Sequence, residues 1–107
     1  MGANKEQNRP VRIGGEDYET VAASQTAQVL GTAGSVGDFI GRLIITVTTA
    51  ATSTVALLDN ATSIPIMAAN TAIGVYVVEI GARSVSGAWK VTTGAGVSVL
   101  AVGKFSV

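Results

Sequence analysis

The sequence predicts an all-β domain, a single β-sandwich of about seven strands that follows an extended amino-terminal arm. After Tyr18, short runs of Thr, Val, Ile, Ala and Gly alternate with turn signals, which is the pattern of a sandwich or barrel. The 3.6-residue apolar period of helices is missing. With 107 residues the chain has room for one core, and therefore for one domain.

The first 17 residues differ from the rest of the chain. They are polar, contain Pro10 and two adjacent glycines, and show no alternating apolar pattern. Of the 7 basic and 7 acidic residues, half stand in or beside this segment: Lys5, Glu6, Arg9, Arg12, Glu16, Asp17 and Glu19. We therefore predict a flexible arm over 1–17 and a sandwich domain over 18–107. The arm is either solvated or becomes ordered on a neighbouring subunit.

Two strands and a loop are predicted directly after the arm. The first strand lies near 19–30, and a glycine-spaced loop follows over 31–38. The segment 39–48 has apolar residues on both faces, which indicates a central strand or a strand with one face in an interface. Strict alternation places Phe39 on the same face as Leu43 and places Ile40 on the opposite face.

The remaining strands are predicted at 54–58, 62–67, 74–80, 88–92 and 97–105. The turn residues Asp59 and Asn60 indicate that the first two of these form a hairpin. Pro65 places the second strand of that hairpin at a sheet edge, because proline has no N–H to donate to a central ladder. The last two strands are expected to form a terminal hairpin.

Composition argues against several classes of function. The chain is 48% hydrophobic and 13% charged, so its body is expected either to self-associate or to present its faces to a partner. The net charge is zero and no basic run is present, which argues against a nucleic-acid ligand on electrostatic grounds. The uncharged stretches are interrupted by polar residues and the first residues have no apolar core, so neither a membrane span nor a signal peptide is predicted.

We expect no enzymatic activity, no cofactor and no metal. The chain contains neither His nor Cys, the commonest general base and the strongest side-chain nucleophile. The glycine-rich strings at 31–37 and 94–96 lack the spacing of phosphate-binding loops. The carboxylates are interpreted as a solvated charge run (Glu16, Asp17 and Glu19) or as isolated turn and edge residues (Asp38, Asp59 and Glu79).

Trp89 is the single tryptophan of the chain. A strand Trp between apolar neighbours such as Ala88 and Val91 is expected to be a packing anchor, in the core or at an interface. If its ring were exposed, it would suit stacking on a sugar, as in carbohydrate-binding sandwiches.

The charged arm and two segments of the body, ETVAASQTAQVLGTAGSVGDFIGRLIITV and GARSVSGAWKVTTGAGVSVLAVGKF, resemble small virion proteins of tailed bacteriophages. Head decoration, or cement, proteins are the most similar class. The resemblance covers most of the chain after Glu19 and rests on sequence texture and the terminal hairpin. It implies a jelly-roll-like sandwich that forms homodimers or homotrimers and stabilises the capsid shell. It carries over no catalytic residues.

The same resemblance implies a location and a set of partners. The chain would be made in the host cytoplasm and would bind the major capsid protein on the surface of the virion. Its uncharged sheet faces would bury against further copies. The arm would dock through Lys5, Glu6, Arg9, Arg12, Glu16 and Asp17. The alternative is a tail or fibre module that binds a host receptor or a carbohydrate, because such proteins share this texture.

Overall fold

The computed structural model describes residues 16–49 and 53–107. In these residues it contains strands and no helix, and hence none long and apolar enough to cross a membrane. The strands are β1 (Asp17–Val21), β2 (Gln28–Val29), β3 (Phe39–Val47), β4 (Val55–Asp59), β5 (Thr62–Met67), β6 (Gly74–Arg83), β7 (Trp89–Thr92) and β8 (Val97–Lys104). The prediction of an all-β fold is confirmed.

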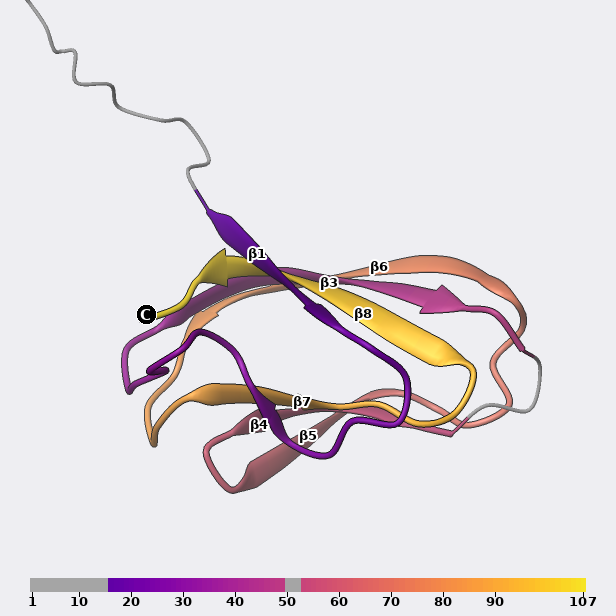
Figure 1. Cartoon of the computed structure of the whole chain (residues 1–107), viewed down its shortest axis with the longest axis horizontal. Coiled ribbons are helices and arrows are strands. Elements are labelled where there is room, and N and C mark those ends of the chain that lie inside the picture. The colour runs from indigo at the N-terminus through magenta and orange to yellow at the C-terminus, as the bar shows by residue number, and fades with distance from the viewer. Residues whose placement is uncertain (1–15, 50–52) are drawn as a thin grey trace, which may run out of the picture.

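The strands lie in two layers, which form a sandwich (Figure 1). One four-stranded sheet has the order β1-β8-β3-β6 and the other has the order β2-β7-β4-β5, with every pairing antiparallel. Of the consecutive strands, β4 and β5 alone share a sheet; each of the other connections passes to the opposite layer. Successive strands, apart from β4 and β5, therefore contribute to the one core from alternate sheets.

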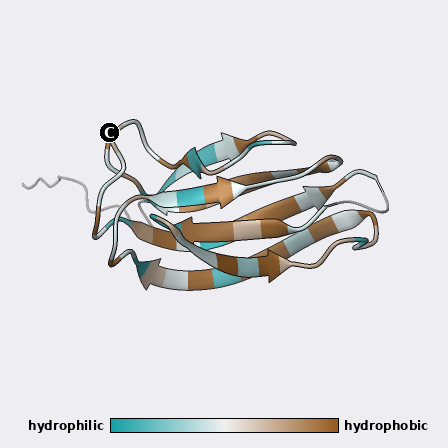
Figure 2. Ribbon diagram, turned by 90° about the horizontal axis from the view of Figure 1, so that it is seen from below, coloured by the Kyte–Doolittle hydropathy of each residue, from teal (hydrophilic) through white to brown (hydrophobic). Residues whose placement is uncertain are grey.

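The core lies between the sheets and is built from every second residue of the strands. In β8, Val97, Val99 and Ala101 are buried, and in β4 the same holds for Val55 and Leu57. Hydrophobic positions accordingly recur along most of the strands (Figure 2). Each large apolar side chain buried here contributes about 1.5–3 kcal/mol to the free energy of folding.

The predicted single strand over 19–30 is wrong, because this segment forms two strands in different sheets. The chain turns between β1 and β2, where Ser24 and Ala27 adopt φ values of 60° and 48°. Both backbone and side-chain bonds hold this turn: the N–H of Thr93 donates to the carbonyl of Gln25 at 2.8 Å, and the hydroxyl of Thr93 accepts from the N–H of Gln25 at 3.0 Å. The described residues thus contain eight strands, one more than predicted.

The predicted faces of the second strand are also wrong in part. β3 lies between β8 and β6 and is central, as expected. Its register shifts between Ile40 and Arg42, however, so that Ile40 and Leu43 both point into the core and both are 0% exposed. The prediction assumed unbroken alternation, and a bulge at Gly41 breaks it.

The predicted hairpin at β4 and β5 is confirmed, and β5, which contains Pro65, is an edge strand. Asn60 makes the tight turn with a φ of 57°. The predicted terminal hairpin is wrong, because β7 and β8 lie in different sheets. The connection at 93–96 crosses from one layer to the other. A short connection between two strands looks the same in a sequence whether it crosses the layers or forms a hairpin.

Candidate interaction surface

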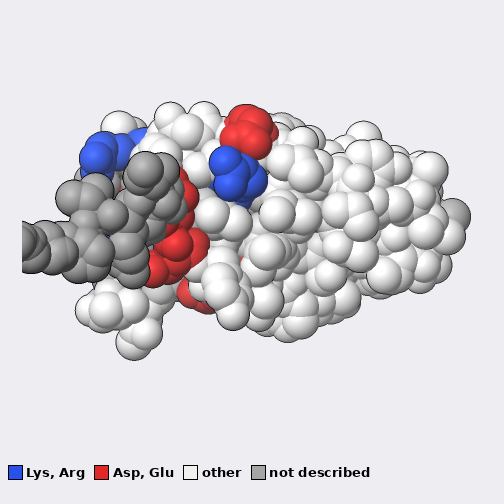
Figure 3. Space-filling view, turned by 90° about the horizontal axis from the view of Figure 1, so that it is seen from above, with Lys and Arg blue, Asp and Glu red and all other residues white. Residues whose placement is uncertain are grey.

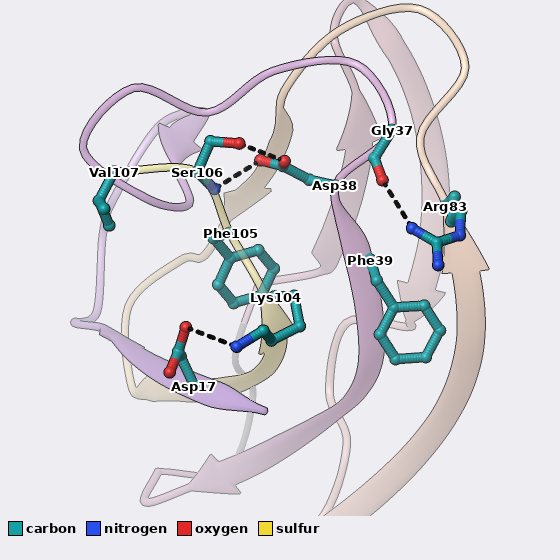
Figure 4. A pocket seen from close by; sticks show the side chains of 9 residues that line it. All are labelled: Asp17, Gly37, Asp38, Phe39, Arg83, Lys104, Phe105, Ser106 and Val107. Carbon is teal, nitrogen blue, oxygen red and sulfur yellow. Dashed lines mark hydrogen bonds and ion pairs between the residues drawn. The ribbon is translucent and has the colours of Figure 1, made fainter. Parts of the chain in front are cut away.

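The carboxylate of Asp38 joins the loop before β3 to the segment after β8 (Figure 4). Its two oxygens accept from the N–H of Ser35 at 3.1 Å and from the N–H and hydroxyl of Ser106 at 3.0 and 2.6 Å. Burial raises the pKa of Asp38, but the hydrogen bonds from Ser106 and Ser35 outweigh it and hold the pKa below its ordinary value. The side chain is therefore an ionised clamp.

Trp89 lies beside this clamp. Its indole N–H donates to the backbone carbonyl of Asp38 at 2.8 Å, and its side chain packs in the core with 3% of the residue exposed. The same carbonyl accepts from the N–H of Ser84 at 2.9 Å. The face of the indole ring is thus enclosed and is not available for stacking on a sugar.

A second buried carboxylate, Asp59, holds the loop between β6 and β7. It accepts from three consecutive backbone N–H groups, those of Val85, Ser86 and Gly87, at 2.9, 3.1 and 3.3 Å. The interpretation of Asp38 and Asp59 as ordinary turn or edge residues missed their burial. For Asp38 the available signal was its position at the end of the Ser- and Gly-rich loop before β3, whose N–H groups need acceptors. The donors to Asp59 lie far along the chain, so no local signal indicated its role.

A shallow, open hollow of about 450 Å³ lies at the same end of the sandwich as Asp38 (Figure 4). The two cations of its lining already have acceptors. Arg83 donates to the carbonyl of Gly37 at 3.3 Å, and the ammonium of Lys104 lies 3.8 Å from the carboxylate of Asp17. No group of carboxylates in the described part of the chain could hold a metal ion. The hollow therefore offers little to bind an anion or a cation.

The outward side of the β1-β8-β3-β6 sheet is a different kind of surface. We call it the outer face; it comprises Tyr18, Thr20, Arg42, Ile44, Thr46, Val75, Val77, Glu79, Ser98, Leu100 and Val102. Ile44 lies at its centre, in register with Leu100 on one side and Val77 on the other. Its strongly exposed large hydrophobic residues are Tyr18, Val75 and Val77, at 72%, 65% and 57%.

This outer face is nearly free of charge. Figure 3 looks onto it and shows a broad white surface, with most charged groups gathered at one end of the molecule. Its charged residues are Arg42 and Glu79, which neutralise each other in an ion pair with a separation of 3.1 Å. A surface of low charge that exposes several large hydrophobic side chains is typical of interaction sites, because the exposure of such side chains to water is unfavourable.

The predicted docking residues are placed as follows. Lys5, Glu6, Arg9 and Arg12 lie outside the described residues. Glu16 is exposed, whereas Asp17 is the first residue of β1, in register with Gly103. Glu19 is not part of a solvated charge run: its carboxylate accepts from the N–H of Gly31 at 2.7 Å and from the side chain of Gln28 at 2.9 Å.

No family model, curated protein or solved structure matches this chain. Its function must therefore be inferred from the surfaces that the fold presents. Among the described residues, the outer face combines the largest exposed apolar side chains of the β1-β8-β3-β6 sheet with a single neutralised ion pair. We take it as the candidate interaction surface.

Proposed function

We propose that the protein is a structural protein of a tailed-bacteriophage virion, which binds the major capsid protein and stabilises the shell as a decoration protein. The observation that carries the proposal is the outer face, a sheet surface of the described residues whose only ion pair is neutral overall and which has three strongly exposed apolar or aromatic residues, Tyr18, Val75 and Val77. The resemblance to decoration proteins supplies the class of particle. This role requires no catalysis, only a surface that is complementary to the shell.

We also propose that the sandwich is a jelly roll. The strand pairs β1-β8, β2-β7, β3-β6 and β4-β5 support this topology. The four pairs are nested: the first strand pairs with the last, the second with the second to last, and the innermost pair is the β4-β5 hairpin. This is the arrangement of one long hairpin that has been rolled up. Eight-stranded jelly rolls of two sheets are common among viral capsid domains.

In this proposal the outer face lies against the shell. A specific protein interface of ordinary size buries about 800 Å² on each partner, and apolar area contributes about 25 cal/mol per Å² before the costs of association. The arm adds charged contacts to the shell through Lys5, Arg9 and Arg12. The protein is made in the host cytoplasm and functions in the virion, on the capsid surface.

Co-sedimentation with purified capsid shells tests the proposal. Leu100→Glu places a charge at the centre of the outer face and is expected to weaken shell binding at least tenfold, or about 1.4 kcal/mol. The matched control is Leu58→Glu, which makes the same change on the outward side of β4 in the other sheet. It should bind as the unchanged protein does. Equal binding by both variants, each with an unaltered melting temperature, contradicts the proposal.

The alternative, a tail or fibre module that binds a receptor or a carbohydrate, would need an exposed aromatic ring. Tyr18, at 72% exposure, is the residue that suits it, since Trp89 and Phe105 are buried. Binding of the protein to a glycan, with loss of that binding in Tyr18→Ala, would favour this alternative over the decoration role.

A further inference from the structure

β6 is the longest strand of the described residues and stands at the edge of its sheet. It pairs with β3 along one side, and no other strand of segments 16–49 and 53–107 pairs with its other side. In an antiparallel strand, the N–H and C=O groups of alternate residues point to opposite sides. Half of the backbone groups of β6 therefore face away from the sheet and are available to another strand.

The other three edge strands carry features that prevent pairing with a further strand. β1 contains the acidic residues Asp17 and Glu19, and β2 is two residues long. β5 contains Pro65, and its register with β4 shifts between Val55 and Ala56. Charge, shortness, proline and bulges are the means by which natural sheets block their edges.

β6 lacks these features over its first half. The sequence from Gly74 to Val78 is GVYVV, without charge or proline, and it stays in continuous register with β3 up to Glu79. The irregularity comes later: Arg42 pairs with Glu79 but Ile40 pairs with Ala82, so β6 contains an additional residue, and Gly81 adopts a φ of 64° there. The unblocked edge thus ends at the bulge.

We propose that this edge pairs with the same edge of a second copy, antiparallel, about a two-fold axis at Tyr76. The two β1-β8-β3-β6 sheets then join into one sheet of twice the width. The inference rests on the proposed function and deepens it, because it identifies the contact through which copies of the protein associate.

The charges on the strand favour an axis at Tyr76 over one at Val77 or Glu79. An axis at Glu79 would place the two Glu79 carboxylates directly opposite each other, which is unfavourable. An axis at Val77 would place Val75 opposite a carboxylate. An axis at Tyr76 places Val75 opposite Val77 of the second copy on both sides of the centre, and it leaves Glu79 opposite Ile73, in its 3.1 Å ion pair with Arg42.

This geometry has a consequence for the outer face. A two-fold axis normal to a sheet leaves the same side of both sheets facing the same way. Pairing through β6 therefore joins two outer faces into one continuous surface of low charge, with Val75 and Val77 of both copies at its centre. A dimer would present this surface to the shell with two linked contacts, which raises its avidity above that of a monomer.

Two matched charge variants test the contact and its register, with mass measured by sedimentation equilibrium. Val75→Lys with Val77→Lys places lysines opposite each other across the axis and should weaken dimerisation at least tenfold. Val75→Lys with Val77→Glu places opposite charges there and should restore the dimer. Both positions are strongly exposed. Each variant should therefore melt at nearly the same temperature as the unchanged protein, as is usual for surface substitutions.

A monomeric unchanged protein, or a dimer that survives the double lysine variant, overturns the inference. A lysine–glutamate variant that dimerises no better than the double lysine variant overturns the axis at Tyr76. Shell binding by the unchanged protein as a monomer would leave the proposed function standing while this inference fails. Dimerisation through β6 without shell binding would leave this inference standing while the proposed function fails.

Discussion

The indole N–H of Trp89 donates to the backbone carbonyl of Asp38 at 2.8 Å, and this bond connects the two layers of the sandwich. Trp89 begins β7 in one sheet, and Asp38 directly precedes β3 in the other. Because the carboxylate of Asp38 also holds Ser35 and Ser106, one buried pair of residues fixes the loop, the tryptophan and the last residues of the chain together.

Replacement of Trp89 tests how much this junction stabilises the fold. Trp89→Ala should lower the free energy of unfolding by about 3–5 kcal/mol, because it leaves a cavity in the core and an unpaired carbonyl. Trp89→Phe, which keeps most of the apolar volume and loses the hydrogen bond, should lower it by less. Urea unfolding followed by circular dichroism measures both; an alanine variant as stable as the unchanged protein would refute the anchoring role.

Acid should destabilise the protein through Asp38. Because folding lowers the pKa of this carboxyl group, its contribution to stability is complete above its unfolded pKa of about 4 and is lost as the pH falls through the lower folded pKa. Asp38→Asn should be less stable at neutral pH, on the order of 2 kcal/mol, and its stability should change less between about pH 4 and pH 2. Parallel stability curves for the two proteins over this range would contradict the ionised clamp.

Engineered cysteines provide an independent check of the β6 contact, because the chain has no cysteine of its own. Val75→Cys with Val77→Cys should give a disulfide-linked dimer under mild oxidation, since each new thiol faces its counterpart in the second copy. Val75→Cys alone should cross-link poorly, because it faces Val77. Non-reducing electrophoresis distinguishes them, and equally efficient cross-linking of the single variant would argue for a different register.

Removal of the arm should affect attachment and leave folding intact. A chain that begins at Glu16 keeps the whole of β1 and all the core residues. We expect it to melt and self-associate like the full chain but to bind capsid shells at least tenfold more weakly, about 1.4 kcal/mol. Shell binding unchanged by the truncation would show that Lys5, Glu6, Arg9 and Arg12 do not dock.

Local sequence patterns predicted most of the strands, but they did not predict which strands pair across long stretches of the chain. The strand predicted over 74–80 and the turn predicted at Asp59 and Asn60 depend on neighbouring residues, and both predictions are confirmed. The single strand over 19–30 and the terminal hairpin were wrong because the layer to which a strand belongs depends on partners far along the chain: Asp17 pairs with Gly103, and Gln28 with Val91.

The candidate surface could be anticipated only in outline. The low charge of the body predicted an interaction surface, but not which sheet would present it. That choice depends on long-range strand pairing, which places Ile44 between Leu100 and Val77 on the outward side of the β1-β8-β3-β6 sheet. The role of Asp59 was out of reach for the same reason, since its donors stand 26 to 28 residues away in the sequence. For Asp38 one donor residue stands 3 residues away, but the other stands 68 residues away.

The most direct test of the decoration role is an image reconstruction of capsid shells saturated with the protein. We predict density for pairs of sandwiches on the shell surface, with the β1-β8-β3-β6 sheet toward the shell and the β2-β7-β4-β5 sheet toward solvent. Bare shells, or sandwiches attached through the β2-β7-β4-β5 sheet, would contradict the account.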